Sequence, residues 1–170
     1  MKVTSEIIKT ALMHLYRFKK GYLVATEFGY ELGIADVMTL SKDNEVIEIE
    51  VKISKSDLLS ELKHKEEKHR VLKEAQESKW APNRFFFCVP TFLVQDTIEF
   101  CEATNPKYGV IEFDNDHGFI KHPEKLLSVA RKSQKLHSKD RSKWFREYVM
   151  KRMNNDLVKM YRDKYWRSNG

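Results

Sequence analysis

Residues 34–53 have the sequence IADVMTLSKDNEVIEIEVKI, which predicts two strands joined by a tight turn. The second strand, residues 45–53, alternates with period two: its odd positions are apolar, and its even positions from Glu48 to Lys52 are charged. If the turn consists of the three residues 42–44, the strands pair Asp36 with Glu50, and their side chains lie about 5 Å apart on one face. A slip of one residue would separate them.

Two neighbouring carboxylates repel each other unless positive charge lies between them. Mg²⁺ is the usual solution, because it binds one or two carboxylates and fills its other positions with water and substrate phosphate. Lys52 projects to the same face as Glu50 and could orient or deprotonate an attacking water, or neutralise charge in a transition state. Asp36, Glu50 and Lys52 therefore have the chemistry for metal-assisted hydrolysis of a phosphodiester.

The alternative interpretation is an edge hairpin with one solvated, charged face. In both interpretations we expect these charged side chains to be exposed. Substitution of Glu50 or Lys52 should then change the free energy of unfolding by no more than about 1 kcal/mol.

The sequence on either side of this hairpin predicts helices and further strands. Residues 4–19 predict an amphipathic helix, and a long polar helix begins after Ser54, whose hydroxyl and the carboxylate of Asp57 have the spacing of a capping box. The remaining elements are predicted as strands at 22–30, 84–89, 108–113 and 118–121, and helices at 92–102, 123–137 and 140–166. The order predicts an α/β domain whose mixed sheet is covered by helices.

The composition limits the function classes. The chain has 170 residues, two cysteines and no apolar run near the roughly 18 residues of a membrane span, so we expect a cytoplasmic protein with no membrane partner. The net charge is +6, and residues 121–170 hold 15 Lys and Arg against 5 Asp and Glu. A basic C-terminal third favours a nucleic-acid partner, although a solvated, salt-bridged helix has the same composition. The candidate DNA contacts are Lys63, Lys65, Arg131, Lys132 and Lys135.

The arrangement of Asp36 followed by Glu50-Val51-Lys52 resembles the D…ExK signature of the PD-(D/E)XK nuclease superfamily. The resemblance extends to the MmcB-like DNA-repair proteins and related phage proteins of that superfamily. It rests on the stretches TEF (26–28), ADVMTL (35–40), IEIEVKISKSDLLSELKH (47–64), PNRFFFCVP (82–90) and YGVIEFDNDHGFIKHPEKL (108–126).

This resemblance implies a restriction-endonuclease-like core over residues 1–137. The basic C-terminal helix predicted over 138–170 lies outside the resemblance. The resemblance also implies hydrolysis of DNA with Mg²⁺, for which Mn²⁺ can substitute. Asp36, Glu50 and the backbone carbonyl of Val51 would be metal ligands, and Lys52 the catalytic lysine. Glu27 would be an additional acidic ligand, and Glu6 on the first helix is its rival.

The function expected from the resemblance is an endonuclease of DNA repair, recombination or phage DNA processing. Two alternatives remain: a catalytically silent DNA-binding module of the same fold, acting as a subunit or recruiter, and an enzyme that acts on RNA. The last helix carries an apolar stripe that we expect to pack on the body or on a second subunit in a homodimer. Its members are Phe145, Val149, Met153, Leu157 and Met160.

Overall fold

The computed structural model describes residues 3–76, 78–114 and 122–165. Its centre is one mixed sheet of six strands in the order β1-β2-β3-β4-β5-β6. The neighbours β1/β2, β2/β3 and β5/β6 are antiparallel, whereas β3/β4 and β4/β5 are parallel. The strands are β1 (Leu23–Tyr30), β2 (Gly33–Leu40), β3 (Val46–Val51), β4 (Arg84–Pro90), β5 (Gly109–Phe113) and β6 (Leu127–Arg131).

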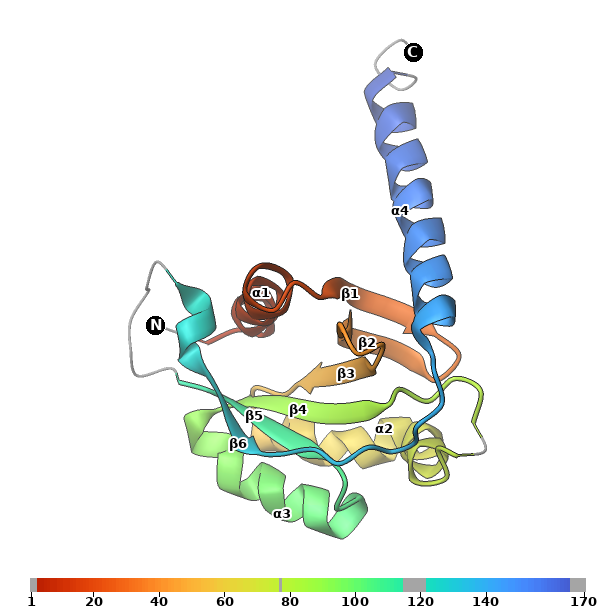
Figure 1. Cartoon of the computed structure of the whole chain (residues 1–170). Helices are drawn as coiled ribbons and strands as arrows, with labels where there is room; N and C mark the ends of the chain where they lie inside the picture. The colour runs from red at the N-terminus through yellow and green to blue at the C-terminus, as the bar shows by residue number, and fades with distance from the viewer. Residues whose placement is uncertain (1–2, 77, 115–121, 166–170) are drawn as a thin grey trace.

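Helices cover both faces of this sheet, which confirms the predicted α/β class (Figure 1). The α-helices are α1 (Ser5–His14), α2 (Lys55–Lys73), α3 (Val94–Thr104) and α4 (Ser142–Tyr165), and the short elements are the π-helical η1 (Leu15–Lys19) and the 3₁₀ turns η2 (Thr91–Leu93) and η3 (Pro123–Leu126). The predicted first helix therefore changes at Leu15 from α to π geometry. α1 lies on one side of the sheet, and α2 and α3 lie on the other (Figure 1).

The alternation of β3 divides the interior into two chemically different halves. Ile47, Ile49 and Val51 pack with Ile8 and Leu12 of α1 in an apolar core. Glu48 and Glu50 face the other way and are also fully buried, because α2 lies over them. The expectation that this charged face is exposed to solvent is therefore wrong, because α2 covers it and lysines of α2 bind its carboxylates.

The hairpin between β2 and β3 has the predicted register. Val37 pairs with Ile49 and Leu40 with Val46, as a three-residue turn requires. The N–H of Ser41 bonds the carbonyl of Glu45 at 2.9 Å, and Asn44 adopts a left-handed φ of 61° within the turn. A type I turn followed by a left-handed residue is the common geometry of three-residue hairpin loops. One register step beyond Val37 and Ile49, Asp36 and Glu50 become neighbours.

The predicted helix over residues 123–137 is wrong. Its place is taken by η3 and by β6, which pairs antiparallel with β5 through Leu127↔Phe113 and Val129↔Ile111. The chain then continues without a helix, with the N–H of Leu136 donating to the carbonyl of Asn83 at 2.8 Å. A helix at this position would leave the backbone N–H and C=O groups along the free edge of β5 unpaired. Pairing of β6 with β5 satisfies them, so tertiary structure overrides the local preference for a helix. The predicted strand over residues 118–121 lies outside the described residues.

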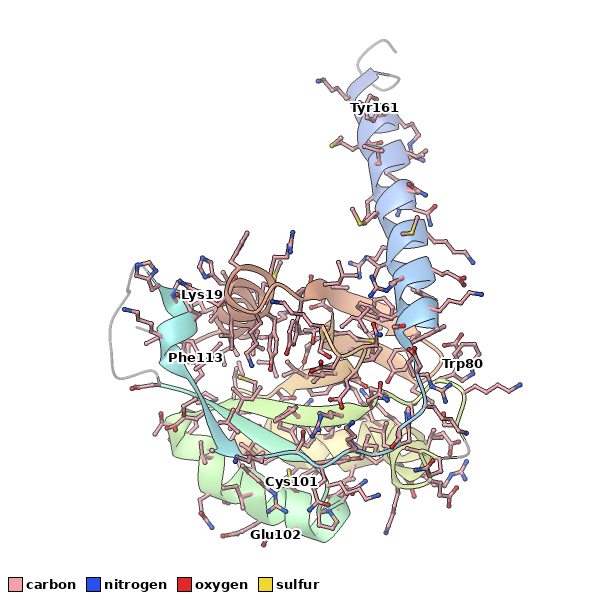
Figure 2. All side chains as sticks on the ribbon, viewed as in Figure 1. Lys19, Trp80, Cys101, Glu102, Phe113 and Tyr161 are labelled. Atoms are coloured by element: carbon pink, nitrogen blue, oxygen red, sulfur yellow. The ribbon has the colours of Figure 1, made fainter. Side chains whose placement is uncertain are left out.

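The last helix packs on the body through its first turns only. Phe145 is fully buried and its ring centroid lies 5.3 Å from that of Phe28. Met153 and Leu157 are 65% and 48% exposed, so this part of the stripe does not pack on the body, and its packing on a second subunit stays a prediction. The far part of α4, where Tyr161 is labelled, extends away from the sheet (Figure 2). Within the described ranges, no helix combines the length and apolarity needed to cross a membrane.

Candidate functional site

Asp36 lies in β2 beside the end of β3. Its Oδ2 accepts a hydrogen bond from the backbone N–H of Val51 at 2.7 Å. Burial, and then the charge of Glu50, raise the pKa of the Asp36 carboxyl to about 6. In the part of the chain that the structure describes, no cationic side chain forms an ion pair with Asp36. Asp36 is therefore a partly buried carboxylate next to another carboxylate, without a direct counter-ion.

Glu50 is neutralised by two lysines of α2. Lys65 Nζ lies 2.7 Å from Glu50 Oε2, and Lys68 Nζ bonds the other oxygen, Oε1. Burial alone would favour the neutral acid, but Lys68 and Lys65 hold the pKa of Glu50 below its ordinary value. Glu50 is thus a buried anion with one ammonium group on each oxygen.

Lys52 follows β3 and is directed toward the beginning of α2. Its Nζ lies 2.6 Å from Glu61 Oε2 and 3.5 Å from Asp57 Oδ1. Burial opposes the charged form, but Glu61 outweighs it and raises the pKa of Lys52 above its ordinary value. The raised pKa favours the ammonium form of Lys52 in this arrangement.

Glu48 and Tyr30 are site residues that the sequence analysis missed. The Tyr30 hydroxyl donates to Glu48 Oε2 at 2.6 Å, and Lys68 bonds the other Glu48 oxygen. Burial raises the pKa values of both Glu48 and Tyr30. Burial disfavours the charged form of Lys68, but Glu48 and Glu50 raise its pKa. Lys68 therefore bridges two buried carboxylates, and its removal would leave both without compensation.

A second group of missed residues continues the network on α2. Glu61 Oε1 lies 3.3 Å from His69 Nε2, and His69 Nδ1 lies 2.8 Å from the hydroxyl of Tyr108. Burial opposes ionisation of Glu61, but the hydrogen bond to His69 and the charges of Lys65 and Lys52 lower its pKa to about 2. A signal for this group exists in the sequence, because residues 61, 65, 68 and 69 share one face of a helix.

The N-terminus of α2 is capped as predicted, with the N–H of Asp57 donating to the hydroxyl of Ser54 at 3.2 Å. Capping by Ser54 starts the helix immediately after Lys52 and Ile53, so α2 returns across the charged face of β3. α2 is not continuous: Lys65 has the non-helical angles φ −128° and ψ 30°, which kink the helix where Lys65 reaches Glu50.

Glu27 lies nearer to Asp36 than Glu6 does. In β1 it occupies the position between Thr26 and Phe28, which pair with Val37 and Ala35 on either side of Asp36. Glu27 and Asp36 also line one groove of 650 Å³ together with Lys65 and Lys68 of α2. The Glu27 carboxylate bonds Lys9 Nζ at 2.5 Å, and its backbone has a left-handed φ of 47°. Glu6 lies on α1, and its carboxylate is 3.7 Å from Lys9 Nζ.

The five candidate DNA contacts do not gather at this site. Lys65 is part of it, whereas the Lys63 side chain is exposed on the other face of α2. Arg131 ends β6 at the opposite edge of the sheet from β1 and pairs with Glu102 at 2.9 Å. Lys132 is exposed. Lys135 forms an ion pair with Glu45 at 2.5 Å. Glu45 precedes β3, so this pair lies at the other end of the strand from Glu50.

The donor set at Asp36 fits a single hard cation. Asp36 and Glu50 supply carboxylate oxygens, and Val51 adds a backbone carbonyl nearby, which is the kind and number of protein ligands that Mg²⁺ uses. Across the described ranges, no group of three or more His, Cys, Asp and Glu side chains is placed to hold a metal ion, so a cation here would rest on two carboxylates and backbone or solvent oxygen. A cation on Glu50 would have to share its carboxylate with Lys65 and Lys68 or replace one of them.

Comparisons with known proteins show the fold. The structure is similar over its whole length to SPO1766, a protein of unknown function from Silicibacter pomeroyi, with a TM-score of 0.57, 15% sequence identity and coverage of 98% of that chain. It is less similar to an XisH family protein from Nostoc punctiforme, with a TM-score of 0.42 and 12% identity over 64% of this chain and 91% of that one. No family model and no curated protein matches the sequence.

Proposed function

We propose that this protein is a Mg²⁺-dependent endonuclease that hydrolyses phosphodiester bonds of DNA, in repair, recombination or phage DNA processing. The observation that carries the proposal is the pair of carboxylates Asp36 and Glu50, of which Asp36 has no cationic partner among the described residues. A divalent cation is the simplest group that would neutralise Asp36 and also draw a phosphate to it.

The charge balance of the buried network supports this choice. Its carboxyl groups outnumber its lysines: Asp36, Glu48, Glu50 and Glu61, with Asp57 at the edge of the network, lie near Lys52, Lys65 and Lys68. Among these groups Asp36 has no direct cationic partner in the described residues, and burial, followed by the charge of Glu50, raises its pKa. One bound divalent cation would offset this excess of negative charge, which suits an anionic substrate.

Mg²⁺ held by Asp36, Glu50 and the Val51 carbonyl would polarise a phosphate and lower the pKa of bound water. Lys52 would then act by charge. Because its pKa is raised, it remains an ammonium group that stabilises negative charge in the transition state. Glu61 and Asp57 position that ammonium group at the end of β3.

A basic groove beside the site supports a polyanionic substrate. A groove of 580 Å³ between β1 and α4 is lined by Lys151, Arg152 and Lys159, and also by the acidic Glu27 and Asp156. Glu27 lines the groove of Asp36 as well, so the two grooves adjoin. Arg152 donates to the carbonyl of Glu27 at 2.9 Å, which joins α4 to β1 at this point. A strand bound along α4 would therefore be led toward Asp36.

The proposal is tested by incubating supercoiled plasmid and labelled oligonucleotides with the protein in Mg²⁺, Mn²⁺ or EDTA. We expect metal-dependent cleavage by the wild type and at least a hundredfold loss in Asp36→Asn and in Glu50→Gln, because removing one electrostatic stabiliser typically costs about 10²–10³ in rate. Asp43→Asn, in the exposed turn of the same hairpin, is the control and should cleave normally.

One observation favours the second candidate, a DNA-binding module that does not cut. Lys65 and Lys68 already occupy both oxygens of Glu50. If these contacts are permanent, a cation cannot replace either lysine on Glu50, and its binding at the site is weakened. DNA binding without cleavage under every metal condition would favour this module over the nuclease.

A further inference from the structure

We infer that Lys65 is a tethered counter-ion of Glu50 that a divalent cation must displace, so that this residue sets the metal affinity of the site. The inference rests on the proposed function and names how that site is regulated. Two ammonium groups contact Glu50, and the surrounding structure fixes one of them much more firmly than the other.

Lys68 is fixed in place. Its side chain is 2% exposed, and its ammonium group bonds both Glu48 and Glu50. Moving Lys68 would leave two buried carboxylates without a partner, which is strongly unfavourable. Lys68 therefore stays on Glu50 Oε1 whatever binds nearby.

Lys65 is the releasable partner. Its side chain is 28% exposed, and among the described residues only Glu50 Oε2 lies at hydrogen-bond distance, since its second acidic neighbour, Glu61 Oε1, is 3.6 Å away. Glu61 would remain neutralised without it, because Lys52 lies 2.6 Å from its other oxygen. Release of Lys65 therefore exposes one oxygen of one carboxylate, next to Asp36.

The backbone at Lys65 is consistent with this exchange. α2 loses helical geometry at Lys65 itself, so the side chain that reaches Glu50 projects from an existing interruption of the helix. Lys65 also lines the 650 Å³ groove that contains Asp36. An ammonium group displaced from Glu50 would stay in that groove, where a substrate phosphate could replace the carboxylate as its partner.

Such an exchange couples metal and substrate. The cation gains Glu50 Oε2 when Lys65 leaves, and a phosphate in the groove favours that departure. By reciprocity, each ligand then raises the affinity of the other. The site would bind Mg²⁺ weakly by itself and more tightly with a phosphodiester present.

The test is calorimetric titration of Mn²⁺ into the full chain without DNA. Loss of one charged hydrogen bond of this kind is worth a factor of about ten, so Lys65→Met should bind Mn²⁺ about tenfold more tightly than the wild type. Lys65→Arg keeps the cation and should retain wild-type affinity. Lys63→Met removes the same charge from an exposed position two residues away and should also leave the affinity unchanged.

A second measurement needs no variant. Amine labelling of the wild type, read by mass spectrometry, should modify Lys65 faster when Mn²⁺ is added, whereas the labelling of Lys63 should not change. Unchanged labelling of Lys65, or Mn²⁺ binding that Lys65→Met does not tighten, would overturn the inference and leave the proposed function standing. No Mn²⁺ binding by the wild type or any variant would overturn both.

Discussion

The carboxylate of Asp36 accepts a hydrogen bond from the backbone N–H of Val51, the residue between Glu50 and Lys52. This bond holds an aspartate of β2 at the end of β3, beside a second carboxylate and without a direct cationic partner among the described residues. The negative charge of ionised Asp36 does not stabilise the folded protein, because the carboxylate is partly buried beside Glu50. Stability and proposed activity should therefore make opposite demands on Asp36.

Asp36→Asn should stabilise the metal-free protein at neutral pH. The folded-state pKa of Asp36 is about 6, above its ordinary value of 3.8, so the folded protein loses stability as the pH rises through that range. Asparagine keeps an acceptor for the Val51 N–H and has no charge. We expect a gain of about 2–3 kcal/mol at pH 7.5 that disappears below pH 4. Urea unfolding in EDTA at the two pH values measures it; an equal effect at both would contradict the assignment.

Glu50→Ala should destabilise the protein by about 3–5 kcal/mol, since it removes one carboxylate from a buried ion network and leaves Lys68 partly unpaired. This replaces the expectation of a change within about 1 kcal/mol, which assumed exposed charges. Glu50→Gln keeps the shape and should cost less. Thermal unfolding of both variants beside Asp43→Asn, from the exposed turn, separates a buried network from a surface pair.

The hairpin could be predicted from the sequence because its information is local. The alternation from Glu45 to Ile53 and a three-residue turn fix the register, and with it the proximity of Asp36 and Glu50. The position of α2 over the charged face of β3 could not be predicted in the same way. Helical periodicity puts Lys65 and Lys68 on one face, away from Lys63, but only the packing of α2 on β3 places that face over Glu50. The helix predicted at 123–137 failed for a related reason, since pairing with distant β5 decided its conformation.

Lys52→Met should abolish cleavage, whereas Lys52→Arg should retain part of it, because the proposed contribution of Lys52 is positive charge. Its raised pKa keeps it protonated, so the wild-type rate should show no dependence on a lysine between pH 7 and 10. At low metal concentration, the rate should fall as the pH drops through about 6, where Asp36 takes up a proton. Steady-state cleavage rates measured from below pH 6 to pH 10 test both expectations. A rate that increases with a pKa near that of lysine would instead identify Lys52 as a base.

Lys151→Gln and Lys159→Gln should each weaken DNA binding and make it less dependent on salt. Both side chains line the groove that adjoins Glu27, and both are exposed, so their substitution should not alter folding. Removing one lysine–phosphate interaction should lower the slope of log affinity against log salt by about 0.7–0.9. Lys132→Gln removes the same charge at the opposite edge of the sheet and should leave the slope unchanged. Fluorescence anisotropy at four salt concentrations measures the slopes. Equal decreases in all three variants would mean that DNA binding follows net charge rather than the groove between β1 and α4.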